Sequence, residues 1–361
     1  MAMANRETAT ESEHGRVWIA WETQRRSLNL SRRVGARLFV FEGSRVRAVR
    51  YLVSGLKTFR VLSSSRRHIV FVQNPSMVLA SLACLLKPWL GYWLVVDRHS
   101  SDFVFGRDGR YSPVRRILSR LSVYTIRKAD LTVVTNRELA GRVTREGGRP
   151  FVLPDPFPEP TEERDDRSRA GLEILFVCSW AADEPIAEVV EACRRLQGRV
   201  TVFASGRPKK RYASILRMAP ANFVCTGFLP DPEYFRLMAR VDAVMAITRR
   251  PATLVCGAYE AISLGKPVIL GDSAALREYF DRGAVYSDCS PGDLVRKIEM
   301  VAGDLTRHTN EVKKLYAVRA REWEETLAVL NDRLDEMVGK GHAHAVMQPG
   351  RRPQSRSIRH G

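Results

Sequence analysis

The sequence predicts an α/β protein made of two Rossmann-like halves, each with its own parallel sheet. Short apolar runs alternate with stretches of helical periodicity, which is typical of parallel strands wrapped by helices on both faces. Residues 153–171 interrupt this alternation with a run rich in proline and charge that has no apolar period. With 361 residues, the chain is long enough for two domains that each bury a core.

The first half begins the alternation. Apolar runs predict strands at residues 17–21, 37–41, 69–73, 93–97, 131–135 and 151–153. Residues 22–33 are expected to form a loop. Helices are expected at residues 45–62, 76–86 and 112–128. In residues 45–62, apolar side chains recur at the spacing of one helical face, while arginines and a lysine occupy other positions.

The second half repeats the pattern. Strands are expected near residues 174–178, 200–204, 223–226, 243–247, 267–270 and 284–286. Helices are expected near residues 184–197, 212–218, 232–240, 256–264, 276–280 and 291–301. The resulting plan has a flexible N-terminus (1–15), a first domain (16–155), a linker (156–171) and a second domain (172–304). A long helix (305–338) is expected to return toward the first domain, and a disordered basic tail (339–361) follows it.

Positive charge is concentrated in the first half. The net charge is +18, and residues 1–150 hold 27 Lys and Arg against 11 Asp and Glu. Such asymmetry indicates an anionic partner, which can be a membrane surface, a nucleic acid or a phosphorylated substrate. No zinc-finger, helix-turn-helix or aromatic RNA-binding signature accompanies it, so a nucleic-acid binder is disfavoured. The alternative is that the arginines are simply solvated.

The cysteines and the N-terminus bear on the compartment. Six cysteines are scattered without a CxxC pair, which fits buried thiols in a reducing compartment. The first residues are polar and acidic, so no signal peptide is expected. Residues 77–86 form an apolar run too short to span a bilayer. With nearby tryptophans and the basic helix at 45–62, it fits docking onto an anionic membrane surface, although these segments could also be plain core.

The most informative stretch is residues 259–271, YEAISLGKPVILG. A helix of small residues ends at Gly265, Pro267 opens a buried strand, and Gly271 turns the chain out again. Glu260 lies within this otherwise apolar helix, so its carboxylate is expected to pair with a cation or to accept hydrogen bonds from hydroxyls. This stretch resembles the C-terminal half of GT-B glycosyltransferases, especially the family 4 nucleotide-sugar-dependent enzymes, and the resemblance extends loosely over residues 17–323. It implies two Rossmann-like domains facing across a cleft, with a C-terminal crossover helix.

The resemblance assigns a donor role to the same stretch. It implies that Glu260 holds the ribose hydroxyls of a UDP- or GDP-linked sugar, with Tyr259 beside it. In the family a second glutamate, separated from this one by seven residues, contacts the donor sugar. This sequence has Ala252 there, which leaves the donor sugar and the stereochemical outcome open.

The loop after strand 174–178 is the expected diphosphate site. It carries Ser179 and Trp180, and Asp183 is expected to cap the next helix, whose N-terminal amides suit a diphosphate. The family usually has an Arg and a Lys in this loop, and neither is present here. Arg207 and Arg249 are the candidates to replace them, or else they are solvated surface charges.

The first domain holds the catalytic and acceptor candidates. His99 is the candidate base, with Asp97 or Asp102 to orient it, and the alternative is a structural histidine at a strand end. Glu22 is a candidate base if the reaction inverts configuration. The candidate acceptor contacts are Arg25, Arg26, Ser27 and Asn74. No metal and no cofactor beyond the nucleotide-sugar are expected, because enzymes of the resembled fold hold the diphosphate with side-chain cations and helix ends.

The sequence therefore predicts a nucleotide-sugar-dependent glycosyltransferase. It is expected to be cytoplasmic, to dock on the inner face of the membrane, and to act on a lipid-linked or polysaccharide acceptor. One alternative is a sugar epimerase of the same fold. Another is a non-catalytic subunit or scaffold for a partner transferase, because Ala252 replaces the first glutamate and the phosphate-loop cations are missing.

Overall fold

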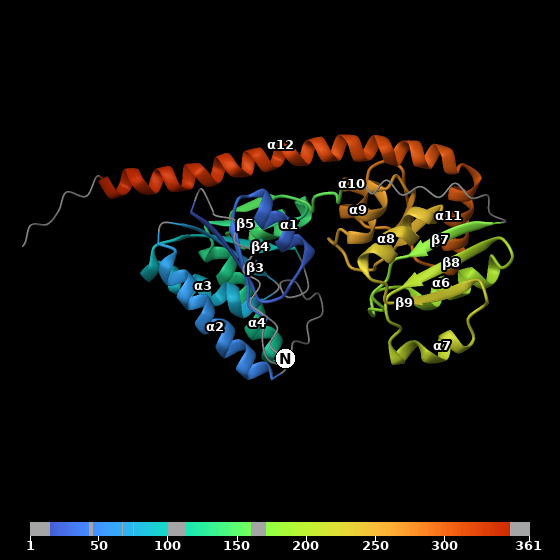
Figure 1. Cartoon of the computed structure of the whole chain (residues 1–361), viewed down its shortest axis with the longest axis horizontal. Coiled ribbons are helices and arrows are strands. Elements are labelled where there is room, and N and C mark those ends of the chain that lie inside the picture. Colours follow the sequence, from blue (N-terminus) through green and yellow to red (C-terminus); the bar gives the residue numbers. More distant parts are fainter. Residues whose placement is uncertain are drawn as a thin grey trace, which may run out of the picture. The chain divides into compact units, whose positions relative to one another are not determined.

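The computed structural model describes residues 15–42, 46–66, 68–74, 76–99, 113–159 and 171–346. These residues form two six-stranded sheets, ordered β2-β1-β3-β4-β5-β6 and β12-β11-β10-β7-β8-β9. The pairings of β1 with β2 and β3, and of β7 with β8 and β10, are parallel. The predicted α/β class is confirmed (Figure 1).

The first sheet and its helices follow in chain order. They are β1 (Arg16–Ala20), α1 (Arg25–Arg33), β2 (Arg37–Val40), α2 (Arg47–Ser64), β3 (Ile69–Asn74), α3 (Met77–Leu90), β4 (Trp93–Arg98), α4 (Pro113–Lys128), β5 (Leu131–Val134), α5 (Arg137–Arg145) and β6 (Pro150–Val152). Two of these helices differ from the prediction, since α1 replaces the expected loop and α5 was not expected. In α1, Ser27 and Ser31 occupy buried positions beside the buried Leu30 and Val34, so polar residues interrupt the apolar period of the helix.

The second sheet carries the remaining elements. They are β7 (Leu172–Phe176), α6 (Ile186–Arg195), β8 (Val200–Ser205), the short 3₁₀ helix η1 (Lys210–Tyr212), α7 (Ala213–Arg217), β9 (Phe223–Gly227), α8 (Asp231–Arg240), β10 (Ala243–Ala246), α9 (Cys256–Ser263), β11 (Val268–Gly271), α10 (Ala274–Tyr279), β12 (Ala284–Ser287), α11 (Pro291–Gly303) and α12 (Leu305–Val346).

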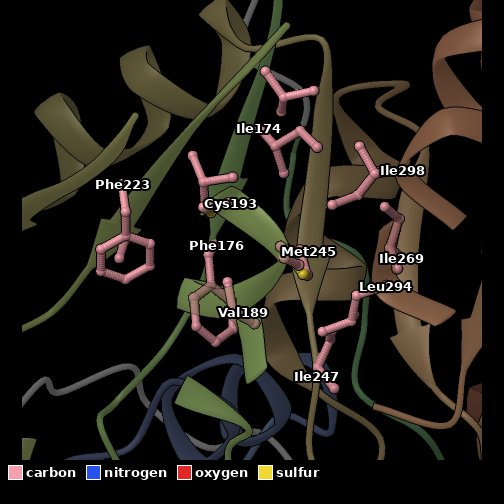
Figure 2. Close-up of a cluster of buried hydrophobic side chains, with 14 of the residues drawn as sticks. Ile174, Phe176, Val189, Cys193, Phe223, Met245, Ile247, Ile269, Leu294 and Ile298 are labelled. Atoms are coloured by element: carbon pink, nitrogen blue, oxygen red, sulfur yellow. The ribbon is translucent and has the colours of Figure 1, made fainter. Parts of the chain in front are cut away.

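Side-chain alternation gives this sheet a separate core on each face. On β7, Ile174 and Phe176 join one buried cluster while Leu175 joins the other. The first cluster also takes Val189 of α6 and Leu294 of α11, so these two helices cover one face (Figure 2). Strand residues buried on both faces explain why the sequence shows continuous apolar runs here.

Contacts divide the described chain into two compact units. One holds the residues up to Gln73, Val78–Val95 and those from Leu327 onward, and the other holds Asn74–Met77 and Val96–Thr326. The last two strands of the first sheet, β5 and β6, therefore belong to the second unit, in which Asn136 donates a hydrogen bond to the carbonyl of Ala252 at 3.0 Å. The domain limits expected from the sequence stay a prediction.

The long helix α12, orange to red in Figure 1, contributes to both units. In the second unit its Val312 and Leu315 are fully buried. In the first unit, Arg16 Nη1 donates to Asn331 at 2.5 Å and Nη2 to Asp335 at 2.7 Å. The helix continues beyond the expected end at residue 338 to Val346, into the segment expected to be disordered.

Candidate functional site

Glu260 lies on α9, the helix singled out by the sequence. All the residues of α9 from Gly257 to Ser263 are buried, and Glu260 is only 7% exposed. The hydroxyl of Tyr234, on α8, donates a hydrogen bond to Glu260 Oε2 at 2.6 Å. A buried carboxylate is costly unless hydrogen-bond donors surround it. The Tyr234 hydroxyl supplies one such donor from within the chain.

The N-terminal turn of α9 packs tightly on the end of β7. A Cβ on Gly257 would lie 2.9 Å from Val177 Cγ1, so only glycine permits this approach. Val177 directly follows β7 and lies two residues before Ser179, where the loop expected to bind the diphosphate begins. The close contact thus places the helix of Glu260 beside that loop, at the carboxyl end of a parallel strand where ligands usually bind.

The loop itself forms an anion-binding nest. Trp180 has a left-handed backbone, with φ of 59°, and the N–H groups of Ser179 and Ala181 on either side point to one place. Successive amides in such a turn form a concavity for anions. Here the occupant is internal, because Ser179 N–H donates to Glu184 Oε1 at 3.0 Å and Ala181 N–H donates to Oε2 at 2.8 Å.

The segment after β8 holds this loop in place. Trp180 is fully buried and its Nε1 donates to the carbonyl of Ser205 at 2.8 Å. Arg211 Nη2 donates to the Trp180 carbonyl at 3.0 Å, and the Tyr212 hydroxyl to the Ala181 carbonyl at 2.9 Å. Trp180 therefore shapes the nest from inside rather than offering its ring to a ligand.

The loop after β10 is tied to the nest through Asp183. Thr248 donates to Asp183 Oδ2 at 2.6 Å, and Arg250 Nε lies 3.1 Å from the same oxygen. Asp183 was expected to cap α6, but the N-cap position is Pro185 and makes no side-chain cap. The carboxylate of Asp183 instead fixes two loops against each other.

The predicted diphosphate cations are placed differently from one another. Arg249 Nη2 lies 2.6 Å from Glu188 Oε1, in an exposed ion pair. Arg207 is exposed, with its guanidinium carbon 5.7 Å from the centre of the Phe228 ring. Neither is buried, so each side chain has room to reorient toward an anion.

Tyr259, expected beside the nucleotide, is core. It is buried and its ring lies 5.3 Å from those of Phe157 and Phe280 and 5.5 Å from that of Tyr279. Burial raises the pKa of the Tyr279 hydroxyl, so that hydroxyl stays protonated near neutral pH. Tyr259 therefore anchors α9 behind Glu260.

The thiols around the nest are not activated. Burial, followed by the charge of Glu184, raises the pKa of Cys178. Burial also raises the pKa of Cys289 to about 11 despite the opposing effect of Arg249. Both thiols are protonated near neutral pH and are not nucleophiles.

Ala252 occupies the position of the glutamate found in the resembled family. It is buried, with φ of 54°, among Ile126, Val134, Leu139 and Val143. A carboxylate among these apolar side chains would be costly to bury. The packing around this position therefore suits alanine and disfavours the glutamate of the family pattern.

The catalytic candidates of the first half lie at the ends of their strands. Asp97 is fully buried in β4, and its Oδ2 lies 3.5 Å from Nδ1 of the partly exposed His99. Asp102 lies outside the described residues. Glu22 is exposed. The two side chains of Asp97 and His99 are within ion-pair distance, but His99 Nδ1 makes no hydrogen bond among the described residues, so the structure does not show the ring held by Asp97.

The acceptor candidates fall on α1 and β3. Arg25 is exposed at the start of α1, whereas Arg26 and Ser27 are buried. Asn74 ends β3, and its side chain lies outside the described residues. Of this set, Arg25 is the side chain that the described structure presents to solvent.

Sequence reasoning missed Tyr234 and the role of Glu184. Tyr234 precedes Glu260 by 26 residues and no motif joins them. Glu184 lies in the loop between β7 and α6. A carboxylate between a strand and a helix often accepts hydrogen bonds from the backbone amides of that loop, and this is the signal that could have identified it.

A cavity of about 450 Å³ lies elsewhere in the second unit, lined by residues of α5, α10 and α12. Arg137 Nε and Glu278 Oε1 lie 3.2 Å apart on its wall. None of the predicted site residues lines it. Within the described ranges, no three His, Cys, Asp or Glu side chains gather to hold a metal ion. The expectation of a metal-free site stays a prediction.

Comparisons with known proteins place this arrangement among glycosyltransferase structures. No family model matches the chain. No curated protein matches it either. Among solved structures, Anabaena HepE in complex with UDP and glucose has a TM-score of 0.63 at 14% identity, covering 89% of this chain and 91% of that chain.

Two further structures agree. Sucrose-phosphate synthase from Thermosynechococcus elongatus has a TM-score of 0.64 at 13% identity, covering 85% of this chain and 84% of that chain. A glycosyltransferase from Rickettsia africae has a TM-score of 0.61 at 11% identity, covering 89% of both chains. The chain therefore has the GT-B fold that its sequence predicts.

Proposed function

We propose that this chain is a glycosyltransferase that takes a sugar from a UDP- or GDP-linked donor. Its fold is that of glycosyltransferases, including HepE, which was solved with UDP and with UDP-glucose. The observation that carries the proposal is the buried carboxylate of Glu260, hydrogen-bonded to Tyr234 and set beside the loop after β7. A ribose diol is a suitable pair of donors for such a carboxylate.

The diphosphate would lie in the nest of Ser179 and Ala181. Backbone amides stabilise the negative charge that develops on a leaving diphosphate without reorganising during the reaction. Glu184 holds this nest in the described structure, so it must move aside for the donor. Arg249 and Arg207 are exposed cations that can add their charge to the same anion.

The acceptor hydroxyl would be deprotonated by His99. The buried Asp97 carboxylate, 3.5 Å from Nδ1, would orient the ring by accepting a hydrogen bond from Nδ1, and Nε2 would then take the proton. We infer a lipid-linked or polysaccharide acceptor at the inner face of a membrane from the basic first half, where lysine and arginine exceed acidic residues 27 to 11. Among the described helices, none is long and apolar enough to cross a membrane.

A non-catalytic partner subunit is the second candidate. Ala252, sealed in an apolar cluster, removes one donor contact, and Glu184 occupies the nest. A scaffold of this kind would keep nucleotide binding and lack turnover.

The test is thermal stabilisation of the purified protein by UDP, GDP and their sugar conjugates. We expect one nucleotide to raise the melting temperature of the wild type and to have no such effect on Glu260→Gln. Asp293→Asn is the matched control, because Asp293 is an equally buried carboxylate, 7% exposed, on α11. Absence of stabilisation by every nucleotide would refute the donor site.

A further inference from the structure

Helix α2 buries polar side chains and exposes apolar ones. Its buried positions are taken by small hydroxyl side chains, Ser54 and Thr58, together with Leu62. Trp21 Nε1 donates to Thr58 Oγ1 at 2.9 Å, and Ser54 donates to the carbonyl of Phe41 at 3.1 Å. These hydrogen bonds, together with the buried Leu62 and the Tyr51 ring 5.9 Å from the Trp21 ring, attach α2 to the residues that follow β1 and β2.

Five apolar side chains of α2 are exposed along one side of the helix. Val49, Leu52, Val53, Leu56 and Phe59 are 47%, 66%, 39%, 59% and 47% exposed. Their spacing of three and four residues places them in one stripe along the helix. An amphipathic helix of a soluble domain buries such a stripe, and a contiguous exposed one marks an interaction surface.

Cations border the stripe, and acidic residues are absent from it. Arg50 and Lys57 lie on one edge, two turns apart, whereas Arg60 lies within the stripe, one turn after Leu56. The Arg50 guanidinium lies 5.4 Å from the centre of the Tyr51 ring. Residues 46–65 contain no Asp or Glu. Apolar residues flanked by basic ones on a single helix face are typical of helices that lie in a membrane interface.

We propose that α2 docks the protein on an anionic lipid bilayer. Leu52, Leu56 and Phe59 would insert among the acyl chains, while Arg50 and Lys57 contact headgroup phosphates. A second copy is a poorer occupant, because pairing two stripes would bring like charges together without acidic partners. Docking through α2 rests on the membrane location in the proposed function and specifies which helix makes the contact. The observations that support it come from α2 alone.

The test is co-sedimentation of the full chain with vesicles of phosphatidylcholine, with and without phosphatidylglycerol. We expect binding to the anionic vesicles only. In the double variant Leu52→Ser/Leu56→Ser, we expect the partition coefficient to fall at least about 10-fold for each leucine lost from the lipid. Arg50→Gln/Lys57→Gln should weaken binding and reduce its dependence on salt.

Matched controls distinguish binding through this surface from non-specific adsorption to vesicles. Val329→Ser removes a valine that is 58% exposed on α12, and Arg217→Gln removes an exposed cation on α7. Both should bind vesicles as the wild type does. Equal loss in the controls, or no binding to anionic vesicles at all, would overturn the proposal.

The remaining outcomes are distinguishable. If Leu52→Ser/Leu56→Ser turns a dimer into a monomer by light scattering and no vesicles bind, the stripe is a self-association surface and the proposal is wrong. If vesicles bind through α2 but no nucleotide stabilises the protein, docking stands and the proposed transferase function fails. Retained nucleotide stabilisation in the α2 variant shows that the variant is folded.

Discussion

Replacing Glu184 by glutamine should tighten nucleotide binding. In the described structure its carboxylate accepts hydrogen bonds from Ser179 N–H, Ser179 Oγ and Ala181 N–H at 2.8–3.1 Å. An incoming diphosphate must break these bonds, so their free energy is subtracted from its binding. A hydrogen bond to a charged group contributes about 1.5–3 kcal/mol net, and partial exposure of Glu184 favours the low end.

Glutamine keeps one oxygen acceptor, whose bonds are roughly half as strong without the charge, and its NH2 group cannot accept the bonds made by the other carboxylate oxygen. In Glu184→Gln, we therefore expect the free-energy cost of displacing this side chain from the nest to fall by about 1.4 kcal/mol. The dissociation constant of the nucleoside diphosphate should fall about tenfold as a result. Calorimetric titration measures it, with Glu191→Gln as control because Glu191 is on the same helix and pairs with Arg194 and Arg195 instead. An unchanged or weaker affinity would refute competition for the nest.

Three further outcomes are expected. Ala252→Glu should lower the free energy of unfolding in urea by about 3 kcal/mol or more, because it places a carboxylate among buried apolar side chains at a positive φ. Ala252→Gly tolerates the positive φ and should change the free energy of unfolding little. Tyr234→Phe removes the hydrogen bond that orients Glu260 and should weaken nucleotide binding up to about 10-fold without altering the fold seen by circular dichroism. The Arg277 guanidinium holds the pKa of Asp272 below its ordinary value. The stability that this pair contributes is therefore fully present above the unfolded-state pKa of about 3.9, and it is lost as the pH falls through the lower pKa of the folded state. Urea titrations of Asp272→Asn and wild type should differ by less than about 1 kcal/mol at neutral pH, since both side chains are exposed, and should converge in acid.

The sequence was sufficient for the sheets because buried parallel strands leave a local signature. Continuous apolar runs and the stop at Gly265 before β11 are readable from neighbours in the chain. The helix α1 was missed because Ser27 and Ser31 fill buried positions where the pattern requires apolar residues. On α2 the period was correct, but a period alone does not say which side faces the body of the protein.

The site was only partly predictable, because its partners are distant in sequence. Glu260 was found as a charge in an apolar helix, which is local information. Its hydrogen bond to Tyr234 and the link from Thr248 to Asp183 arise from tertiary packing. The burial of Tyr259 and Trp180 likewise depends on neighbours that the sequence does not identify.

The most direct measurement is release of the nucleoside diphosphate from its sugar conjugate in the presence of a membrane lipid extract. The account predicts release by the wild type with the nucleotide that stabilises it, and loss of release in Glu260→Gln while Asp293→Asn retains it. Binding of the nucleotide without release from any of its sugar conjugates would contradict a transferase and assign the chain to the non-catalytic class.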